Sequence, residues 1–238
     1  MTPVVFVHGF MGGSQQWQGQ NDSALGCDII RLDLPGFGAK AHLEALCSIG
    51  DYADWALNEL SKQGVEQVNL VGHSMGGMVV QEMVARAPTR MERLVLYGTG
   101  ATGVLPGRFE TIGTSKRRAV TDGPQATARR ISATWFLERE HASGYEACAA
   151  IAEQCGLPAM LNGLDAMEGW SGAERLEHID TKTLVIWGDC DRTYPWQQTE
   201  QLWQSIPDAN LLGMPGCAHA AHLEKPWLFN SVLKNFLS

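Results

Sequence analysis

The stretch VNLVGHSMGG, residues 68–77, joins a short apolar run to a group of small residues. Within it, Ser74 stands between Gly72 and Gly76 in the pattern Gly-x-Ser-x-Gly. The apolar run is typical of a buried strand, and the residues that follow are typical of a helix. Glycines lack a Cβ atom, so they let a strand and a helix approach closely around a sharp turn. We therefore expect a strand–turn–helix unit that exposes the Ser74 hydroxyl at a helix N-terminus, where developing negative charge is favoured.

Apolar runs alternate with helical patterns along the rest of the chain. The runs occupy residues 4–7, 28–33, 67–71, 93–97, 183–187 and 209–213, and helices are expected at about 50–62, 75–87, 196–206 and 226–237. The runs are apolar nearly throughout, as is typical of strands that are covered on both faces. This alternation predicts an α/β fold with about six mostly parallel strands, right-handed crossovers and flanking helices.

One interval is much longer than a crossover connection needs to be. Residues 98–182 separate the fourth run from the fifth and contain helix-like stretches such as TARRISATWFLERE at 127–140. A long insertion at one end of a rigid sheet commonly forms a lid or a binding surface. We expect residues 99–182 to form an inserted helical cap on a core made of residues 1–98 and 183–238.

The composition limits the classes of function. A chain of 238 residues is long enough for one large α/β domain, and its net charge of −8 argues against a nucleic-acid partner. No stretch approaches the roughly 18–20 apolar residues of a membrane span. The N-terminus does not resemble a signal peptide, and no pair of the six cysteines has C-x-x-C spacing. We therefore expect reduced thiols, no zinc site, no membrane partner and a cytoplasmic location.

Two loops after later strands carry a candidate acid and a candidate base. A serine is a poor nucleophile unless a base takes its proton and a carboxylate orients that base. The segment GDCDRTYP, residues 188–195, follows the fifth run, and MPGCAHAAHLEKP, residues 214–226, follows the sixth. The chain order is therefore serine, aspartate, histidine.

The motifs, taken in this order, resemble those of the α/β-hydrolase family, in particular of its small serine esterases, lactonases and carbon–carbon hydrolases. The matching segments are VHGF at 7–10, LDLPGFG at 32–38, GHSMGG at 72–77, GDCDRTYP at 188–195 and GCAHAAHLEKP at 216–226. In the family these are the oxyanion turn, the loop after the next strand, the nucleophile elbow, the acid loop and the base loop. The resemblance covers nearly the whole chain outside the expected cap.

This resemblance implies a role for each catalytic candidate. Ser74 is the expected nucleophile, His219 the base and Asp191 the acid that orients it. The backbone N–H groups of Phe10 and Met75 are the expected oxyanion hole. The implied reaction needs neither a metal nor an organic cofactor.

The family spacing also separates these candidates from their neighbours. It favours His219 over His222, which we expect to be a hydrogen-bonded structural histidine. It favours Asp191 over Asp189, which we expect to stabilise a turn. Two more histidines of these motifs are expected to brace the loop and the elbow: His8 and His73.

Two features depart from the family pattern. The first strand starts at the first residues, without the β-hairpin that usually precedes it, which is why we expect about six strands. Cys217 and Ala218 precede the base where the family often has Gly-x-Gly-His. We expect Cys217 and Cys190 to act as small apolar fillers beside the base and acid segments.

The implied function is that of a serine hydrolase, a monomer or homodimer that cleaves a small carboxylic ester or lactone through an acyl-enzyme. Four residues of the expected cap are candidates to line the substrate pocket, with packing between cap and core as the alternative for each: Trp135, Phe136, Met167 and Trp170. Residues 108–139 carry seven basic and three acidic side chains, so this segment could attract a substrate carboxylate, through Arg129 or Arg130 for example. The alternative is a solvated helix face.

Three other functions stay open. The first is cleavage or formation of carbon–carbon bonds on the same residues, including a menaquinone-pathway-like synthase, because HGFMGGSQQW at 8–17 resembles the start of such enzymes. The Gly-Tyr-Ser elbow and following arginine of those synthases are absent. The second is a cofactor-free haloperoxidase, which usually has tryptophan where Phe10 stands. The third is a ligand receptor built on a hydrolase fold.

Overall fold

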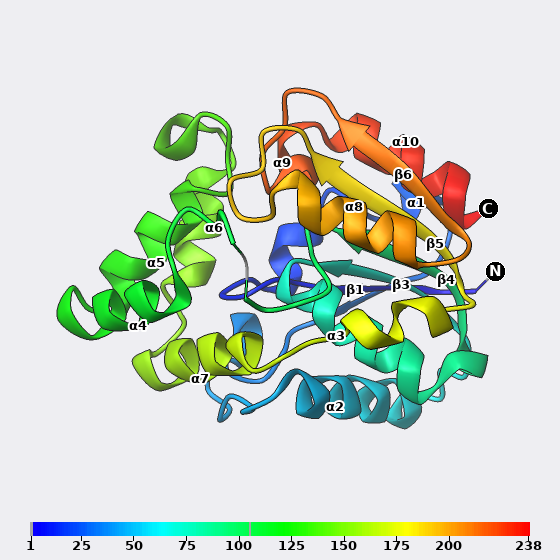
Figure 1. Ribbon diagram of the computed structural model, residues 1–238, viewed down its shortest axis with the longest axis horizontal. Coiled ribbons are helices and arrows are strands. Elements are labelled where there is room, and N and C mark those ends of the chain that lie inside the picture. Colours follow the sequence, from blue (N-terminus) through cyan, green and yellow to red (C-terminus); the bar gives the residue numbers. More distant parts are fainter. Residues whose placement is uncertain (1, 105) are drawn as a thin grey trace.

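The computed structural model describes residues 2–104 and 106–238, which form a parallel six-stranded sheet with the order β2-β1-β3-β4-β5-β6 (Figure 1). The strands are β1 (Val4–Val7), β2 (Ile29–Leu32), β3 (Val68–His73), β4 (Met91–Tyr97), β5 (Lys182–Gly188) and β6 (Ala209–Met214). Every adjacent pair is parallel. The predicted α/β class, the number of strands and the six apolar runs are thereby confirmed.

The inner strands are covered on both faces, whereas the two edge strands are not. In β1, Val5 and Val7 belong to one buried cluster and Val4 and Phe6 to another, because successive side chains point to opposite sides of a strand. In β2 and β6, by contrast, most residues are partly or fully exposed. The expectation of complete coverage was wrong for these two strands because each has a neighbour on one side only.

The helices lie on both faces of the sheet and at one end of it. They are α1 (Asp22–Leu25), α2 (Ile49–Lys62), α3 (Met75–Arg86), α4 (Ile112–Thr121), α5 (Pro124–Ala133), α6 (Tyr145–Ala152), α7 (Leu157–Glu168), α8 (Trp196–Ser205), α9 (Ala221–Glu224) and α10 (Pro226–Leu237). The four helices expected outside the long interval correspond to α2, α3, α8 and α10. Among the described residues, no helix is long and apolar enough to cross a membrane.

Two hydrophobic clusters hold the helices against the sheet. Side chains of α2, α3 and α8 join the cluster of Val5 and Val7. Side chains of α1 and α10, such as Leu25 and Phe229, join the cluster of Val4 and Phe6 on the other face. Each face of the sheet therefore has its own helical layer, as the alternation of strands and helices predicts.

Helices α4 to α7, which we call the cap helices, lie beyond the carboxyl ends of the strands, in green in Figure 1. The helix-like stretch at 127–140 is α-helical only as far as Ala133. There the chain tightens into short turns, with Thr134 N donating to Ile131 O at 2.9 Å and Trp135 N donating to Ser132 O at 3.1 Å. The turns send the chain back towards the sheet, where Trp135 O accepts a hydrogen bond from Ala220 N at 2.8 Å.

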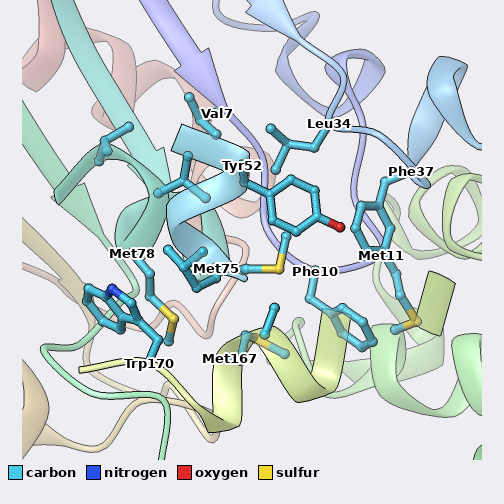
Figure 2. Packing of buried hydrophobic residues seen from close by; sticks show 14 of the residues in the cluster. Val7, Phe10, Met11, Leu34, Phe37, Tyr52, Met75, Met78, Met167 and Trp170 are labelled. Atoms are coloured by element: carbon cyan, nitrogen blue, oxygen red, sulfur yellow. The ribbon is translucent and has the colours of Figure 1, made fainter. Parts of the chain in front are cut away.

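The cap helices share their core with the sheet. Figure 2 shows Met167 and Trp170, at the end of α7, in the same cluster as Met75 and Met78 of α3. The Trp170 indole also donates a hydrogen bond to Glu82 of α3 at 2.8 Å. The end of α7 is therefore anchored on the body of the molecule by both apolar and polar contacts.

Candidate active site

Ser74 occupies a strained turn between β3 and α3. Its φ is +56° and its ψ is −121°, a conformation that side-chain-bearing residues rarely adopt. A Cβ atom on Gly76 would lie 2.2 Å from the carbonyl oxygen of Val7, and one on Gly72 would lie 2.4 Å from Val80. Glycine is therefore required on both sides of the serine, for the close approach that the motif predicts.

Two hydrogen bonds hold this turn in place. The Ser74 N–H donates to the carbonyl of Tyr97 at 3.0 Å, and the Thr99 hydroxyl donates to the Ser74 carbonyl at 2.7 Å. Both partners lie at the carboxyl end of β4 or just after it. The neighbouring strand thus supports a conformation that costs roughly 1–3 kcal/mol.

Asp191 and His219 form a buried pair. The Nδ1 atom of His219 lies 2.8 Å from Oδ2 of Asp191, and both side chains are at most 1% exposed. The other carboxylate oxygen accepts hydrogen bonds from the N–H groups of Thr193 at 2.7 Å and Tyr194 at 3.1 Å. These bonds orient the carboxylate towards the imidazole, whose Nε2 is then the atom free to exchange a proton.

The segment that carries His219 is held through its backbone. The Tyr97 hydroxyl donates to the His219 carbonyl at 2.7 Å, and Nε2 of His73 lies 3.0 Å from the same oxygen. Burial, followed by the nearby His219 and His222, lowers the pKa of His73 well below its usual range. His73 is therefore neutral and donates this hydrogen bond from Nε2–H.

Asp189 and His222, the alternatives to the expected acid and base, make structural contacts. Asp189 Oδ1 accepts hydrogen bonds from Gly216 N at 2.7 Å and Cys217 N at 3.4 Å, so it ties the acid loop to the base loop. His222 Nδ1 lies 3.2 Å from the Tyr97 hydroxyl, and its ring lies 4.4 Å from that of Trp17. Burial lowers the pKa of His222 to about 3.

His8 braces the turn after β1. Its Nδ1–H donates to the Gly9 carbonyl at 2.8 Å, and its Nε2 accepts from Leu34 N at 3.0 Å. Burial lowers the pKa of this imidazole as well, so the neutral form makes both contacts.

Ser74 and His219 line one cavity of about 30 Å³, which we call the inner cavity. A volume of this size has room for about one or two water molecules. Its full lining is Gly9, Phe10, His73, Ser74, Gly103, Arg108, Phe109, Ile112, Ile131, Trp135, Met167, Thr193, Tyr194 and His219. The structure thus brings the expected nucleophile and base to one hollow beneath the cap helices.

Of the four expected pocket residues, Trp135 and Met167 line this cavity. The other two have different surroundings. Phe136 packs beneath Gly144, where an added Cβ would lie 3.1 Å from its ring, and Trp170 contacts α3 through Glu82. Trp170 thus packs cap against core, the alternative considered for each residue, whereas the contact of Phe136 with Gly144 lies within the expected cap.

Phe10 and Met75 flank the serine from two directions. Phe10 follows β1 and lines the inner cavity, and Met75 is the first residue of α3. The first N–H groups of a helix have no partner within it, so the Met75 N–H is available at the α3 N-terminus. The backbone of β1 passes close to the serine, because a Cβ on Gly9 would lie 2.9 Å from the Ser74 Cβ.

Tyr194 is a site residue that the motif analysis missed. Its ring stacks on His219, with centroids 5.6 Å apart and planes 13° apart, and it lines the inner cavity together with Ser74. Burial raises the pKa of Tyr194 to about 12, so the phenol stays protonated at neutral pH. The signal available in the sequence was its position three residues after the expected acid.

The described residues contain no cluster of three or more His, Cys, Asp or Glu side chains placed to hold a metal ion. The six cysteines are free thiols. Burial raises the pKa of Cys217 to about 11, so this neighbour of the base is a neutral thiol.

Comparison with known proteins agrees with this fold. The sequence profile described as "Alpha/beta hydrolase family" matches residues 4–228. A putative carbamate hydrolase RutD from Azorhizobium caulinodans is 28% identical, covering 99% of this chain and 91% of the relative. A 2-hydroxy-6-oxononadienedioate/2-hydroxy-6-oxononatrienedioate hydrolase from a Pseudomonas species is 27% identical, covering 99% and 87%. The enol-lactonase from Burkholderia xenovorans LB400 superposes with a TM-score of 0.89 at 22% identity, covering 99% and 91%. The chain therefore belongs to the alpha/beta hydrolase family.

Proposed function

We propose that this protein is a serine hydrolase that cleaves a small carboxylic ester or lactone through an acyl-enzyme. The observation that carries the proposal is the convergence of three elements on the inner cavity. Ser74 stands on its strained turn, and His219 lines the same cavity with Asp191 behind its Nδ1 atom. Residues 99–182 act in this proposal as the lid.

The first half of the reaction forms the acyl-enzyme. Ser74 Oγ attacks the carbonyl carbon while its proton passes to His219 Nε2, and Asp191 stabilises the imidazolium that forms. The backbone N–H groups of Phe10 and Met75 stabilise the negative charge on the carbonyl oxygen. Each such donor contributes about 3–4 kcal/mol to acyl-transfer reactions. His219 then gives its proton to the leaving alcohol as the bond between acyl carbon and alcohol oxygen breaks.

The second half releases the acid. Water loses a proton to His219 and attacks the acyl carbon, and the Ser74 oxygen leaves with the proton that His219 returns. In a lactone the leaving alcohol stays attached to the acyl group, so one ring-opened hydroxy acid is released. The net reaction consumes one water and leaves the enzyme unchanged.

The test is a panel of 4-nitrophenyl esters, lactones and carbamates, assayed on the wild type and on Ser74→Ala. We expect Ser74→Ala to lower kcat by at least about a thousandfold, because it removes only the nucleophilic hydroxyl. A serine-directed fluorophosphonate should label the wild type at Ser74, as read by peptide mass spectrometry. Labelling at another residue, or retained activity in the variant, would overturn the proposal.

Hydrolysis of a carbon–carbon bond is the second candidate. The observation in its favour is the 27% identity to a hydrolase whose name gives 2-hydroxy-6-oxononadienedioate as its substrate. The same three residues can serve this reaction, so the two candidates differ only in substrate. Turnover of a 2-hydroxy-6-oxo-dienoate at a higher kcat/KM than any ester or lactone in the panel would favour the second candidate.

A further inference from the structure

Arg108 stands between two hollows of different size. One is the inner cavity at Ser74. The other, which we call the outer groove, has a volume of about 250 Å³. It is lined by Val104, Pro106, Gly107, Arg108, Glu110, Thr111, Ile112 and Glu168. Arg108 and Ile112 line both hollows, so a substrate larger than a few atoms that reaches Ser74 from the outer groove passes the Arg108 guanidinium.

Most of the nearby basic side chains of the cap already have acidic partners. Arg130 pairs with Glu110 at 2.8 Å, and Arg129 pairs with Glu146 at 2.8 Å. Lys116 pairs with Glu168, the second carboxylate of the outer groove. Arg129 and Arg130, which the sequence suggested as carboxylate-binding residues, are therefore already engaged in ion pairs.

Arg108 has a different environment. Its Nη1 donates to the Glu110 carbonyl at 2.9 Å and to the Ser115 hydroxyl at 3.3 Å, and its guanidinium lies 4.5 Å from the Phe109 ring centroid. Within the described residues, none of the ion pairs includes Arg108, and its Nε and Nη2 atoms donate no hydrogen bond. The contacts of Nη1 hold the guanidinium in place and leave its Nε and Nη2 atoms available to a ligand.

Electrostatics at this position favours an anion. Burial lowers the pKa of Arg108, the nearby Tyr194 and Glu110 oppose that effect, and Arg130 adds to it. The guanidinium remains charged, because arginine is not deprotonated in proteins. A partly desolvated cation without a carboxylate partner gains more from an incoming anion than an exposed one does.

We propose that Arg108 binds a carboxylate of the substrate, so that the preferred ester or lactone carries an acid group close to the bond that is cleaved. The distance between the carboxylate and the reacting carbonyl is short, because Ser74, Tyr194 and Arg108 all line the inner cavity of about 30 Å³. The reacting carbonyl would occupy the inner cavity, with the carboxylate held by Nε and Nη2 at its border with the outer groove. This inference names the substrate class of the proposed function and rests on it.

The test compares 4-nitrophenyl hydrogen glutarate with its neutral methyl ester. We expect the wild type to prefer the carboxylate form. Arg108→Met should lower the ratio of kcat/KM values for the two substrates by about ten- to a hundredfold, mainly through KM, because it removes a charge-assisted pair. Arg108→Lys, which keeps the charge and loses the fork, should lose part of this preference.

Arg117→Met is the matched control. It removes one positive charge from an exposed position of α4, where Arg117 donates to the Thr114 hydroxyl. The control should keep the wild-type ratio. An equal loss in both methionine variants would assign the preference to the general charge of the cap and overturn the role of Arg108.

A binding measurement separates failure of this inference from failure of the proposed function. Titration calorimetry with glutarate should show binding to the wild type and to Ser74→Ala, and loss of that binding in Arg108→Met. Hydrolysis of both glutarates at equal rates through Ser74 would overturn the inference and leave the proposed function standing. If neither ester is hydrolysed, loss of glutarate binding in Arg108→Met alone would still support the anion site, and equal binding in all variants would overturn it.

Discussion

The side chains of Asp189 and Asp191 lie two positions apart in one loop and meet different groups. Asp191 contacts the imidazole of His219, whereas Asp189 accepts hydrogen bonds from backbone N–H groups of the base loop. An asparagine keeps an oxygen acceptor but adds an N–H donor and loses the charge. The same substitution should therefore have unequal effects at the two positions.

Asp191→Asn should lower kcat by about four orders of magnitude, since an amide in place of the carboxylate favours the wrong tautomer of His219. Asp189→Asn is the control, because its side-chain oxygen can still accept from Gly216 and Cys217. We expect its kcat to stay within about tenfold of the wild type. Steady-state kinetics on the best ester of the panel decides the matter, and a reversed order would mean that the acid is Asp189.

At the scale of elements, the packing of α3 against β1 depends on the absence of a Cβ atom at Gly76. The Val7 carbonyl at the end of β1 lies where a side chain at Gly76 would begin, 2.2 Å from an added Cβ. The obstacle is backbone rather than the end of a flexible side chain, so relief requires α3 to move away from the sheet. Such a movement would also disturb the turn that carries Ser74.

Gly76→Ala should therefore lower the free energy of unfolding by about 1–3 kcal/mol or more, the usual cost of overpacking a core. It should also reduce kcat, because the turn would shift. Urea denaturation gives the first quantity. Gly213→Ala in β6 is the control, because an added Cβ there meets no atom within 4 Å. Equal stability of the two variants would contradict the packing argument.

The features that could be predicted at these two scales have local signals. The six strands follow from short, mostly apolar runs, and the elbow follows from glycines whose spacing a close approach requires. The candidate acid and base follow from the loops after the last two strands. Arg108 has no such signal, because an arginine in a basic stretch looks the same whether it is solvated or lines a cavity. The position of Tyr194 after the expected acid was visible in the sequence, but its stacking on His219 was not. The directions of Phe136 and Trp170 depend on turns after α5 and α7, which periodicity does not describe.

At the scale of the whole molecule, three buried histidines make folding depend on pH. His8, His73 and His222 are at most 5% exposed, and burial lowers the pKa of each from its ordinary value of 6.5. Below pH 6.5 these histidines bind protons in the unfolded chain but stay neutral in the folded chain. The folded state is therefore destabilised as the pH falls through this window.

We expect the free energy of unfolding to fall between pH 6.5 and about pH 4, with each of these histidines adding up to about 1.4 kcal/mol per pH unit. His222→Gln should reduce the slope by about one proton, since the pKa of His222 is lowered to about 3. Urea denaturation at a series of pH values measures the slope. The exposed His178→Gln variant is the control, and a slope that His222→Gln leaves unchanged would contradict the expectation.

The two hydrogen bonds from Tyr97 and His73 to the His219 carbonyl have a consequence for how this protein can vary over evolution. Both donors hold a main-chain oxygen, which any residue at that position would supply. These two hydrogen bonds do not depend on the side chains just before His219, where Ala218 stands at the second glycine of the Gly-x-Gly-His pattern and Cys217 at its variable position. Cys217 and Ala218 are fully buried, so variation at these two positions is limited by packing and not by the bonds that hold the His219 backbone.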